Sequence, residues 1–437
     1  MDPPETLQDG QYLHNLAAEL FPITRSITGD GVRKTLARLQ SELPNLRLHE
    51  VPSGTPVLDW TIPDEWNAVD AYVLNPSGKR VVDFTKSNIH LVSYSTPIDA
   101  TMSLTELRPH LHVDVDHPNA IPYVTSYYNR TWGFCLTEEE LRLLPEADYH
   151  AVVDTTLSPG SLTYADLVIP GDSAAEVLIS TYICHPSLAN NELSGPMVAI
   201  GLALWLSSLP SRRYSYRFVF APETIGAITY INNNLDQLQE KVVAGINLTC
   251  IGDEGDFSYL ASRQGNTPID RIARRQLTVR PNAVEYTYLD RGSDERHYCM
   301  PGVDVPMISL MRTKYGEYSE YHTHLDDLTV VTPTGLQGGL DFARDVIAEL
   351  EISDYLQSTV LGEPQLGRRG LYHAMHARTV ADDVLLRTHI LAFADGKHSL
   401  SDMTDLFDVP QDILTELAEE LEQHGLLVRG PLREPGS

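Results

Sequence analysis

One stretch constrains the fold of this chain more than any other: an apolar run followed at once by a polar loop. Residues 177–183, Val-Leu-Ile-Ser-Thr-Tyr-Ile, predict a buried strand, and residues 196–209 predict a helix that packs on a sheet. The loop between them, 184–195, reads Cys-His-Pro-Ser-Leu-Ala-Asn-Asn-Glu-Leu-Ser-Gly. Open α/β sheets bind ligands at the carboxyl ends of their strands. His185 is therefore a candidate metal ligand or general base, although a histidine here could also serve only to hydrogen-bond the turn.

The same alternation of strand and helix continues from about residue 166 to residue 356, which predicts a parallel or mixed sheet with helices on both faces. The expected strands are 177–183, 216–221, 242–248, 284–289 and 305–310. The expected helices are 196–209, 226–239, 266–279 and 335–352.

The segments before and after this α/β region have different sequence patterns. Residues 11–43 predict two helices, with Asp30 or Thr28 as the expected cap of the second. Short β-like runs, Pro, Asn and Gly then predict a β-rich domain, and the end of the chain resembles a winged helix. The predicted units are an α/β domain (1–45 and 166–360), an inserted β-rich domain (46–165) and a winged helix (366–437).

Composition narrows the classes of partner. The 437 residues carry a formal net charge of −28, which disfavours binding to phosphate backbones. Residues 366–437 hold seven Lys and Arg against twelve Asp and Glu, so we expect this winged helix to serve packing or dimerisation and not nucleic-acid binding. If the protein forms a homo-oligomer, we expect the contact to be made by the winged helix or by the inserted domain.

Location in the cell is a further expectation. No apolar run approaches the roughly 20 residues of a membrane span, so no membrane partner is expected. The acidic start, Met-Asp-Pro-Pro-Glu, does not read as a signal peptide. The four cysteines lie far apart without a Cys-x-x-Cys spacing, which argues against a disulfide framework and favours the cytoplasm.

Polar clusters follow several expected strands. Glu223 comes just after 216–221, the stretch 247–254 follows 242–248, and the string 321–327 contains His322 and His324. If the strand ends meet, His185, Glu223 and His322 lie together, and two histidines with a carboxylate suit zinc. A nearby carboxylate that is not a ligand can then take a proton from the metal-bound water. The alternative is that both later histidines are surface polar residues on a loop.

Two further stretches predict substrate contacts. In the loop 291–298, Arg291 and Arg296 could bind a substrate carboxylate, or could pair with the neighbouring acids Asp294 and Glu295. Aromatic residues gather in 122–134; most are expected in the core of the inserted domain, and a few to wall a pocket at the domain junction. The predicted substrate-binding residues are Asn191, Arg291, Arg296, Tyr127, Tyr128 and His324.

Taken together, these stretches resemble the zinc aminopeptidases of the M28 peptidase clan, which share a phosphorylase/hydrolase-like α/β fold. More narrowly, the chain resembles a bacterial family of aminopeptidase-like proteins with an inserted β-rich domain and a C-terminal winged helix, often found among polysaccharide or natural-product biosynthesis genes. This narrower resemblance covers almost the whole chain. Its strings are 21–33, 121–136, 181–195, 292–301 and 315–327.

The resemblance implies roles for individual residues. His185 matches the first metal-binding histidine of the peptidases, His322 the last, and Glu223 the general base. At three other positions the chain departs from the pattern, because Asn191, Thr224 and Thr249 stand where the peptidases have metal-binding carboxylates.

Two dications without these carboxylates would repel one another strongly, so we do not expect a two-zinc site. The most that the sequence supports is one zinc per chain, held by His185, His322 and a carboxylate. Glu192 and Asp294 are the candidates for that third ligand. A metal-free site, with Glu223 and the two histidines as acid–base groups, is the alternative.

Three functions follow as hypotheses. The first is a metal-dependent hydrolase that cleaves an amide bond of a small amino-acid-derived or peptide substrate, with Glu223 moving the proton. The second is a scaffold turned to cyclisation, acyl transfer or condensation, as in the glutaminyl cyclases, which resemble the same clan and keep a single zinc. The third is a catalytically silent binding or regulatory protein that meets a partner through its winged helix.

Overall fold

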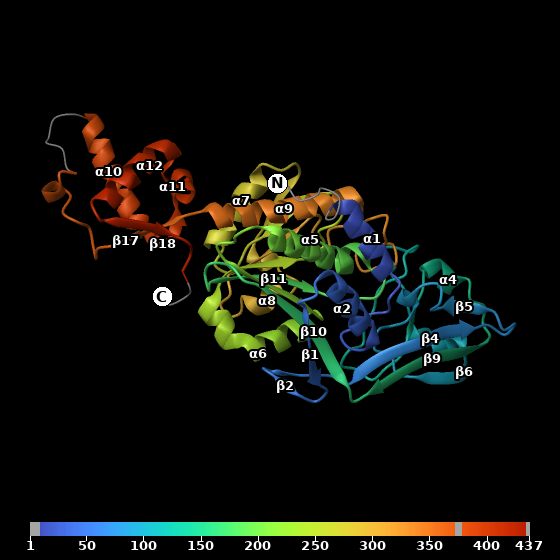
Figure 1. The fold of residues 1–437 in the computed structure, drawn as a ribbon. Helices are drawn as coiled ribbons and strands as arrows, with labels where there is room; N and C mark the ends of the chain where they lie inside the picture. The colour runs from blue at the N-terminus through green and yellow to red at the C-terminus, as the bar shows by residue number, and fades with distance from the viewer. Residues whose placement is uncertain (1–8, 372–377, 434–437) are drawn as a thin grey trace.

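A large mixed sheet forms the centre of the molecule (Figure 1). The computed structural model describes residues 9–371 and 378–433. Within them, the strands of this sheet are, in order, β1 (Arg47–Pro52), β10 (Ser161–Ile169), β12 (Ser215–Ala221), β11 (Glu176–Tyr182), β13 (Val242–Leu248), β16 (Met307–Met311), β14 (Phe257–Leu260) and β15 (Ala283–Tyr286). Strands β12, β11, β13 and β16 run parallel, so their carboxyl ends meet at one edge.

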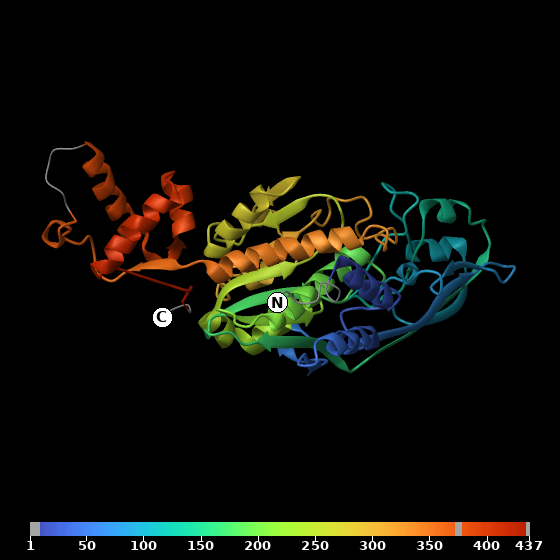
Figure 2. The same cartoon turned by 45° about the horizontal axis from the view of Figure 1, so that its top comes forward.

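Helices cover both faces of the sheet. One face carries α1 (Gly10–Leu20), α2 (Asp30–Glu42), α5 (Ser194–Ser208), α7 (Pro268–Thr278) and α9 (Pro333–Ile352). The other face carries α6 (Ile225–Lys241) and α8 (Glu295–Tyr298). Helix α5 lies between the sheet and helices α1 and α9, which explains why it is apolar on almost every side (Figure 2). The predicted α/β class with a mixed sheet is confirmed.

Some local predictions need correction. Only the first part of the expected strand 284–289 is extended, because Tyr288–Asp290 form a 3₁₀ turn. Neither Asp30 nor Thr28 caps α2: Gly29 holds the N-cap position with φ of 97°, and the Thr28 hydroxyl bonds Tyr94 instead. A side chain at Gly29 would also meet the Trp66 carbonyl oxygen at 2.1 Å, so glycine is required at this approach.

The β-rich insert has its own sheet, in the order β5 (Arg80–Asp83), β4 (Glu65–Leu74), β9 (Asp148–Ser158) and β6 (Ile98–Ser103). Around it lie β2 (Pro56–Val57), β3 (Trp60–Thr61), α3 (Leu104–Leu107), β7 (Leu111–His112), β8 (Phe134–Cys135) and α4 (Glu138–Arg142). The predicted bounds 46 and 165 assign β1 and part of β10 to the insert, whereas both strands pair in the large sheet. No helix separates them from the insert, so composition does not mark the boundary.

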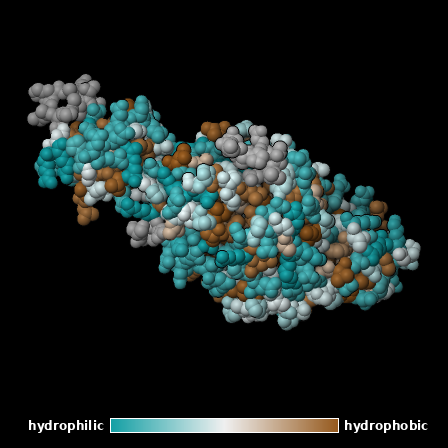
Figure 3. All heavy atoms as spheres, in the orientation of Figure 1, coloured by the Kyte–Doolittle hydropathy of each residue, from teal (hydrophilic) through white to brown (hydrophobic). Residues whose placement is uncertain are grey.

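The C-terminal unit is a winged helix with a core of its own (Figure 1). It comprises β17 (Tyr355–Ser358), α10 (Arg378–Phe393), β18 (Asp395–Ser399), α11 (Leu400–Phe407), α12 (Gln411–Gln423) and β19 (Leu427–Gly430). The predicted helix, turn, helix and wing strand are confirmed. On the face drawn in Figure 3 this unit is mostly hydrophilic. The predicted domain ranges also include 1–8, 372–377 and 434–437, which lie outside the described residues.

In the described part of the chain, every helix is too short or too polar to cross a membrane.

Candidate active site

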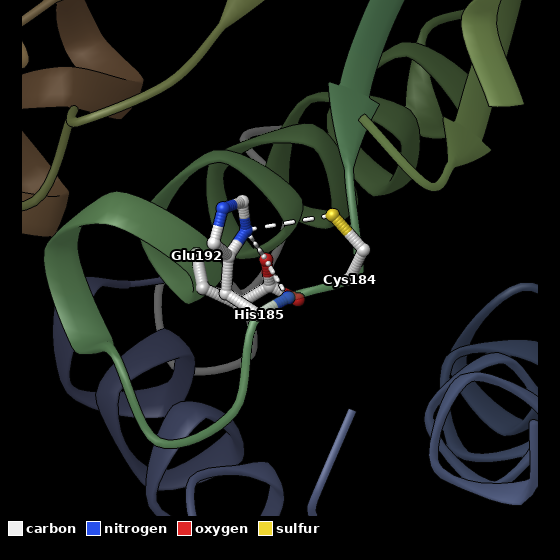
Figure 4. A group of neighbouring side chains, drawn as sticks. All are labelled: Cys184, His185 and Glu192. Carbon is white, nitrogen blue, oxygen red and sulfur yellow. Dashed lines mark hydrogen bonds and ion pairs between the residues drawn. The ribbon is translucent and has the colours of Figure 1, made fainter. Parts of the chain in front are cut away.

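His185 lies just beyond the carboxyl end of β11, ahead of one turn of π-helix at Ala189–Leu193. Glu192 in that turn reaches back to it: Oε2 lies 2.9 Å from the ring nitrogen Nδ1 and 2.9 Å from the backbone N (Figure 4). The carboxylate therefore fixes the ring through Nδ1 and leaves Nε2 for the site. Burial alone would lower the pKa of His185. The hydrogen bond to Glu192 and the charge of Glu223 outweigh burial, so the pKa lies above its ordinary value.

Arg25 completes this arrangement from the N-terminal segment. Its Nε donates to Glu192 Oε1 at 3.0 Å and to the carbonyl of His185 at 2.9 Å, and Nη1 donates to the carbonyl of Leu20 at 2.7 Å. The guanidinium has no exposed surface. Both oxygens of Glu192 thus have partners, which makes Glu192 an orienting group for His185 and not a free ligand in this arrangement.

Glu223 lies two residues beyond β12, beside His185. Its Oε2 is 3.7 Å from His185 Nε2, and its backbone N–H donates to the Cys184 sulfur at 3.2 Å. Burial raises the pKa of this carboxyl, partly offset by His185 and Arg296. A carboxylate of raised pKa next to the free ring nitrogen is placed to accept and return a proton.

His322 forms the opposite wall. Its ring centroid is 5.7 Å from that of His185, and it stacks on Tyr321 at 4.0 Å. The residue has φ of 54°, an unusual conformation for a side chain other than glycine that keeps the ring on the site. Burial and the nearby His185 lower the pKa of His322 to about 3, so its imidazole is neutral at physiological pH.

The insert reaches the site through a short pairing with the segment after His322. The N–H of Tyr123 donates to the His322 carbonyl at 2.7 Å, and the N–H of His324 donates to the Ile121 carbonyl at 3.0 Å. The ring of Tyr123 then packs 5.2 Å from His185 and 5.4 Å from His322. His185 is only 3% exposed as a result.

Asn191 and Thr249 are two of the three residues that stand where the peptidases have a carboxylate, and the Tyr182 hydroxyl links them. Asn191 Nδ2 donates to the Tyr182 hydroxyl at 2.9 Å, and this hydroxyl lies 2.6 Å from Thr249 Oγ1. The amide oxygen of Asn191 is buried and has no hydrogen-bond partner in the described residues. This chain of neutral groups leaves no anionic ligand for a second metal ion.

The third position, Thr224, is bound from α8. Its backbone N–H donates to Asp294 Oδ1 at 2.8 Å, and its hydroxyl accepts from Arg296 Nη2 at 2.7 Å. Thr224 has φ of 64°, a strained conformation that lets both groups face α8. Asp294 Oδ2 is buried without a hydrogen-bond partner among the residues that the structure describes, and burial together with Glu223 raises the pKa of Asp294 well above its usual value.

These donors can be tested against zinc. Two imidazoles on one tetrahedral zinc, at about 2.1 Å from each nitrogen, place their ring centroids about 5 Å apart. The 5.7 Å between His185 and His322 fits one ion between them. The carboxylate that holds Nδ1 of His185 is the usual partner of a metal-binding histidine. The spacing of the two rings is therefore compatible with one ion, and the neutral side chains of Asn191, Thr224 and Thr249 do not suit a second.

Among the described residues, the one group of three or more metal-ligand atoms that all lie within 4.8 Å of one another is formed by Cys184, His185 and Glu192 (Figure 4). Burial raises the pKa of Cys184 well above that of an ordinary thiol, and metals bind the thiolate. Since Glu192 is also engaged by Arg25, this group is a positioning cluster behind His185 and does not itself suit a metal ion.

The other residues predicted to bind substrate do not all lie at the site. Tyr127 lies behind the site, its hydroxyl 2.8 Å from that of Tyr123. Tyr128 is 56% exposed and packs against Trp60. His324 accepts the N–H of Ile121 at Nδ1, and Arg291 is exposed over the ring of Tyr288. The structure thus brings Asn191 and Arg296 to the site but gives His324 and Arg291 other partners.

Sequence reasoning missed several residues that shape the site. Arg25 lies in the string 21–33, but no local pattern indicates its contact with Glu192. The Asp326 carboxylate accepts the N–H groups of Asn190 at 2.7 Å and Asn191 at 2.9 Å, which anchors the π-turn. Burial raises the pKa of Asp326 to about 7. A signal existed only in the strings 21–33 and 315–327, because neither residue lies near His185 in sequence.

Comparisons with known proteins agree with this architecture. A family model described as a domain of unknown function, DUF4910, matches residues 14–353, and a winged helix-turn-helix model matches residues 354–429. A Clostridium acetobutylicum protein, named as a candidate polysaccharide biosynthesis protein with an aminopeptidase-like domain, is 43% identical over 401 residues, which is 91% of each chain.

Solved structures extend the comparison. The crystal structure of a candidate peptidase from Clostridium acetobutylicum is 40% identical, covers 96% of each chain and gives a TM-score of 0.81. A zinc aminopeptidase from Bacillus subtilis covers 79% of this chain and 96% of its own, with 12% identity and a TM-score of 0.57, which is a likeness of fold alone.

Proposed function

This chain belongs to the DUF4910 family, and we propose that it is a hydrolase that cleaves an amide bond of a small amino-acid-derived substrate with one bound zinc ion. The resemblance to M28-type zinc aminopeptidases is confirmed for the fold. The observation that carries the proposal is the approach of Glu223 to His185 Nε2, at 3.7 Å, with the ring of His322 opposite.

His185 and His322 would hold the zinc. Asp294 is the remaining candidate for a third ligand, because its Oδ2 has no partner whereas both oxygens of Glu192 do. When bound, zinc would polarise the substrate carbonyl and lower the pKa of a water molecule. Glu192 and Arg25 keep the His185 ring in one orientation, which the proposal requires throughout turnover.

Glu223 is the proposed proton carrier. Its raised pKa brings it closer to neutrality, where a carboxylate both accepts a proton from water and returns it to the leaving amine. The rings of Tyr123, Tyr182 and Tyr321 pack against the two histidines, which favours a site shielded from bulk water.

A biosynthetic setting is part of the proposal, supported by the name of the Clostridium acetobutylicum relative. We also propose that the protein works in the cytoplasm, in keeping with four cysteines that are all free thiols. The winged helix is attached to α7 through Asp402, which Arg271 and Arg275 contact at 3.1 and 2.7 Å, so packing or dimerisation remains its proposed role.

The test begins with metal content. We expect elemental analysis of protein purified without chelators or a His tag to give about one zinc per chain, lost in His185→Ala and His322→Ala but kept in His324→Ala. Against a panel of amide substrates, Glu223→Gln should lower turnover at least about 100-fold. Turnover unchanged in Glu223→Gln, or two metal ions per chain, would contradict the proposal.

A second candidate, cyclisation or acyl transfer, is favoured by one observation. When no metal ion occupies His185 Nε2, the contact between this nitrogen and Glu223 can move a proton, and such transfer serves ring closure as well as hydrolysis. Mass spectrometry of the products separates the two. Ring-closed or transferred product without hydrolysed product would select this second function.

A further inference from the structure

Arg296 is a half-buried cation at the edge of the site that is held by neutral partners. Its Nη2 donates to the Thr224 hydroxyl at 2.7 Å, and its Nε donates to His297 Nε2 at 3.1 Å. Because Nε2 of His297 accepts this bond, the ring offers a lone pair and no negative charge. These contacts fix the guanidinium plane without neutralising its charge.

The nearby acids do not pair with it. Glu295 is fully engaged, since its Oε1 accepts from the N–H groups of Gly292 and Ser293 and its Oε2 from Asn247 and Ser309. Asp294 directs Oδ1 to the backbone of Thr224. Among the described residues, the side-chain hydrogen bonds of Arg296 go to Thr224 and His297, and its charge acts on Glu223 and Asp294 only by partly offsetting their raised pKa. Its charge and the N–H groups of Nη1 are therefore available to a ligand.

The position of Arg296 relates it to the reacting groups. Thr224, which it contacts, is the neighbour of Glu223 in sequence. His185 is almost completely buried, whereas Glu223, Thr224 and Arg296 are each half-buried, so this side is the approach from solvent. An amide bound beside His185 and Glu223 would have its outer end toward solvent, on the side where Arg296 lies.

We infer that Arg296 binds a carboxylate of the substrate, carried on the amine side of the scissile amide, so that the substrate is an N-acyl amino acid. This inference rests on the proposed function. The planar guanidinium fork matches a carboxylate better than a lysine ammonium does. The adjacent start of α6 lacks a side-chain cap, and its helix dipole adds to the attraction of an anion.

The surroundings explain why such a cation is needed. The chain carries a net charge of −28, which repels anionic ligands over most of the surface. The site itself also contains Glu223 and Asp294. A carboxylate-bearing substrate therefore requires a fixed, unpaired positive charge at the point of entry, and Arg296 supplies one.

Binding of two matched probes tests the inference without any need for turnover. N-acetylglycine carries a carboxylate, and N-acetylglycinamide replaces it with a neutral amide of similar shape. By isothermal titration calorimetry we expect the wild-type protein to bind N-acetylglycine at least about tenfold more tightly. Arg296→Gln should abolish this preference, and Arg296→Lys should restore only part of it. Arg291→Gln, a change to an exposed arginine of the same loop, should keep it.

Each outcome bears on the inference. Equal binding of both probes by the wild type, or a preference unchanged in Arg296→Gln of wild-type melting temperature, would overturn it. Inorganic phosphate that binds tenfold more tightly than N-acetylglycine would show a phosphate site instead and would also overturn it. Failure of the proposed function is a separate result: the preference between probes would persist while Glu223→Gln leaves turnover unchanged.

Discussion

Arg25 and Glu192 form an ion pair in which neither side chain has any exposed surface, with 3.0 Å between Nε and Oε1. The two residues lie 167 positions apart, and the same carboxylate also holds both the ring and the backbone N–H of His185. The N-terminal segment and the loop after β11 therefore share one anion. Loss of either charge leaves the other buried and unpaired, which is the costly case for an interior ion pair.

We therefore predict that Arg25→Gln lowers the free energy of unfolding by about 3 kcal/mol. The double variant Arg25→Gln/Glu192→Gln should be more stable than Arg25→Gln alone, because it removes both buried charges. Urea unfolding checks both. Arg38→Gln, which breaks partly exposed pairs with Glu19 and Glu42, is the control and should cost less than about 1 kcal/mol. A double variant no more stable than the single would contradict the prediction.

The Asn191 amide oxygen offers a second prediction. In the described part of the chain it is buried without a hydrogen-bond partner, and Nδ2 of the same amide bonds the hydroxyl of Tyr182, whose ring packs 5.3 Å from that of His185. Asn191→Asp should tighten zinc binding at least about tenfold, because an anionic oxygen is the better ligand. Competition with a chromogenic chelator measures the affinity. Asn129→Asp, an exposed change in the insert, should leave it unaltered; an Asn191→Asp protein that binds zinc no more tightly would place this side chain away from the metal.

Periodicity predicted the parallel core of the sheet well because β11, β12 and β13 are buried along their whole length and are mostly apolar. It failed for β1 and β10, which lie toward an edge and carry His49 and Asp166 among their apolar residues. Strand-end reasoning brought His185, Glu223 and His322 together correctly as neighbours.

The part of the site that could not be predicted comes from contacts between distant segments. Nothing near Arg25 in sequence indicates that it reaches Glu192, and nothing near Asp326 indicates that it anchors Asn190 and Asn191. Such partners depend on how α1, the π-turn and the segment after His322 pack in space. A charged residue whose partner lies more than a hundred positions away leaves no local pattern.

Stability at low pH depends on the ion pair between Arg33 and Glu65, which joins α2 to the insert. Arg33 donates from Nη1 to Glu65 at 3.0 Å, and this lowers the pKa of Glu65 to about 2. A carboxylate with a lowered folded-state pKa stabilises the fold above its unfolded pKa of about 4.3 and loses that effect as the pH falls. We predict a loss on the order of 2 kcal/mol between pH 5 and 2.

Glu65→Gln provides the comparison for this pH dependence. The variant should be less stable than the wild type at pH 7, and the difference should shrink toward zero near pH 2, as measured by thermal melting across the range. Glu50→Gln, an exposed change on β1, should follow the wild-type curve. A constant difference between Glu65→Gln and the wild type at every pH would show that the effect is not one of charge.

We expect the winged helix to move away from the α/β domain when the charge of Asp402 is removed. Arg271 and Arg275 of α7 hold this carboxylate at 3.1 and 2.7 Å, and its Oδ2 also accepts the N–H of Ser399 at the start of α11. Asp402→Asn keeps an oxygen for Ser399 but loses the attraction for both arginines. We therefore expect small-angle X-ray scattering to give a larger radius of gyration, while circular dichroism shows an unchanged helix content.

Asp405→Asn removes a 59% exposed partner of Arg275 and should leave the radius of gyration at the wild-type value. An unchanged radius in Asp402→Asn would mean that apolar contacts, and not these ion pairs, hold the two units together.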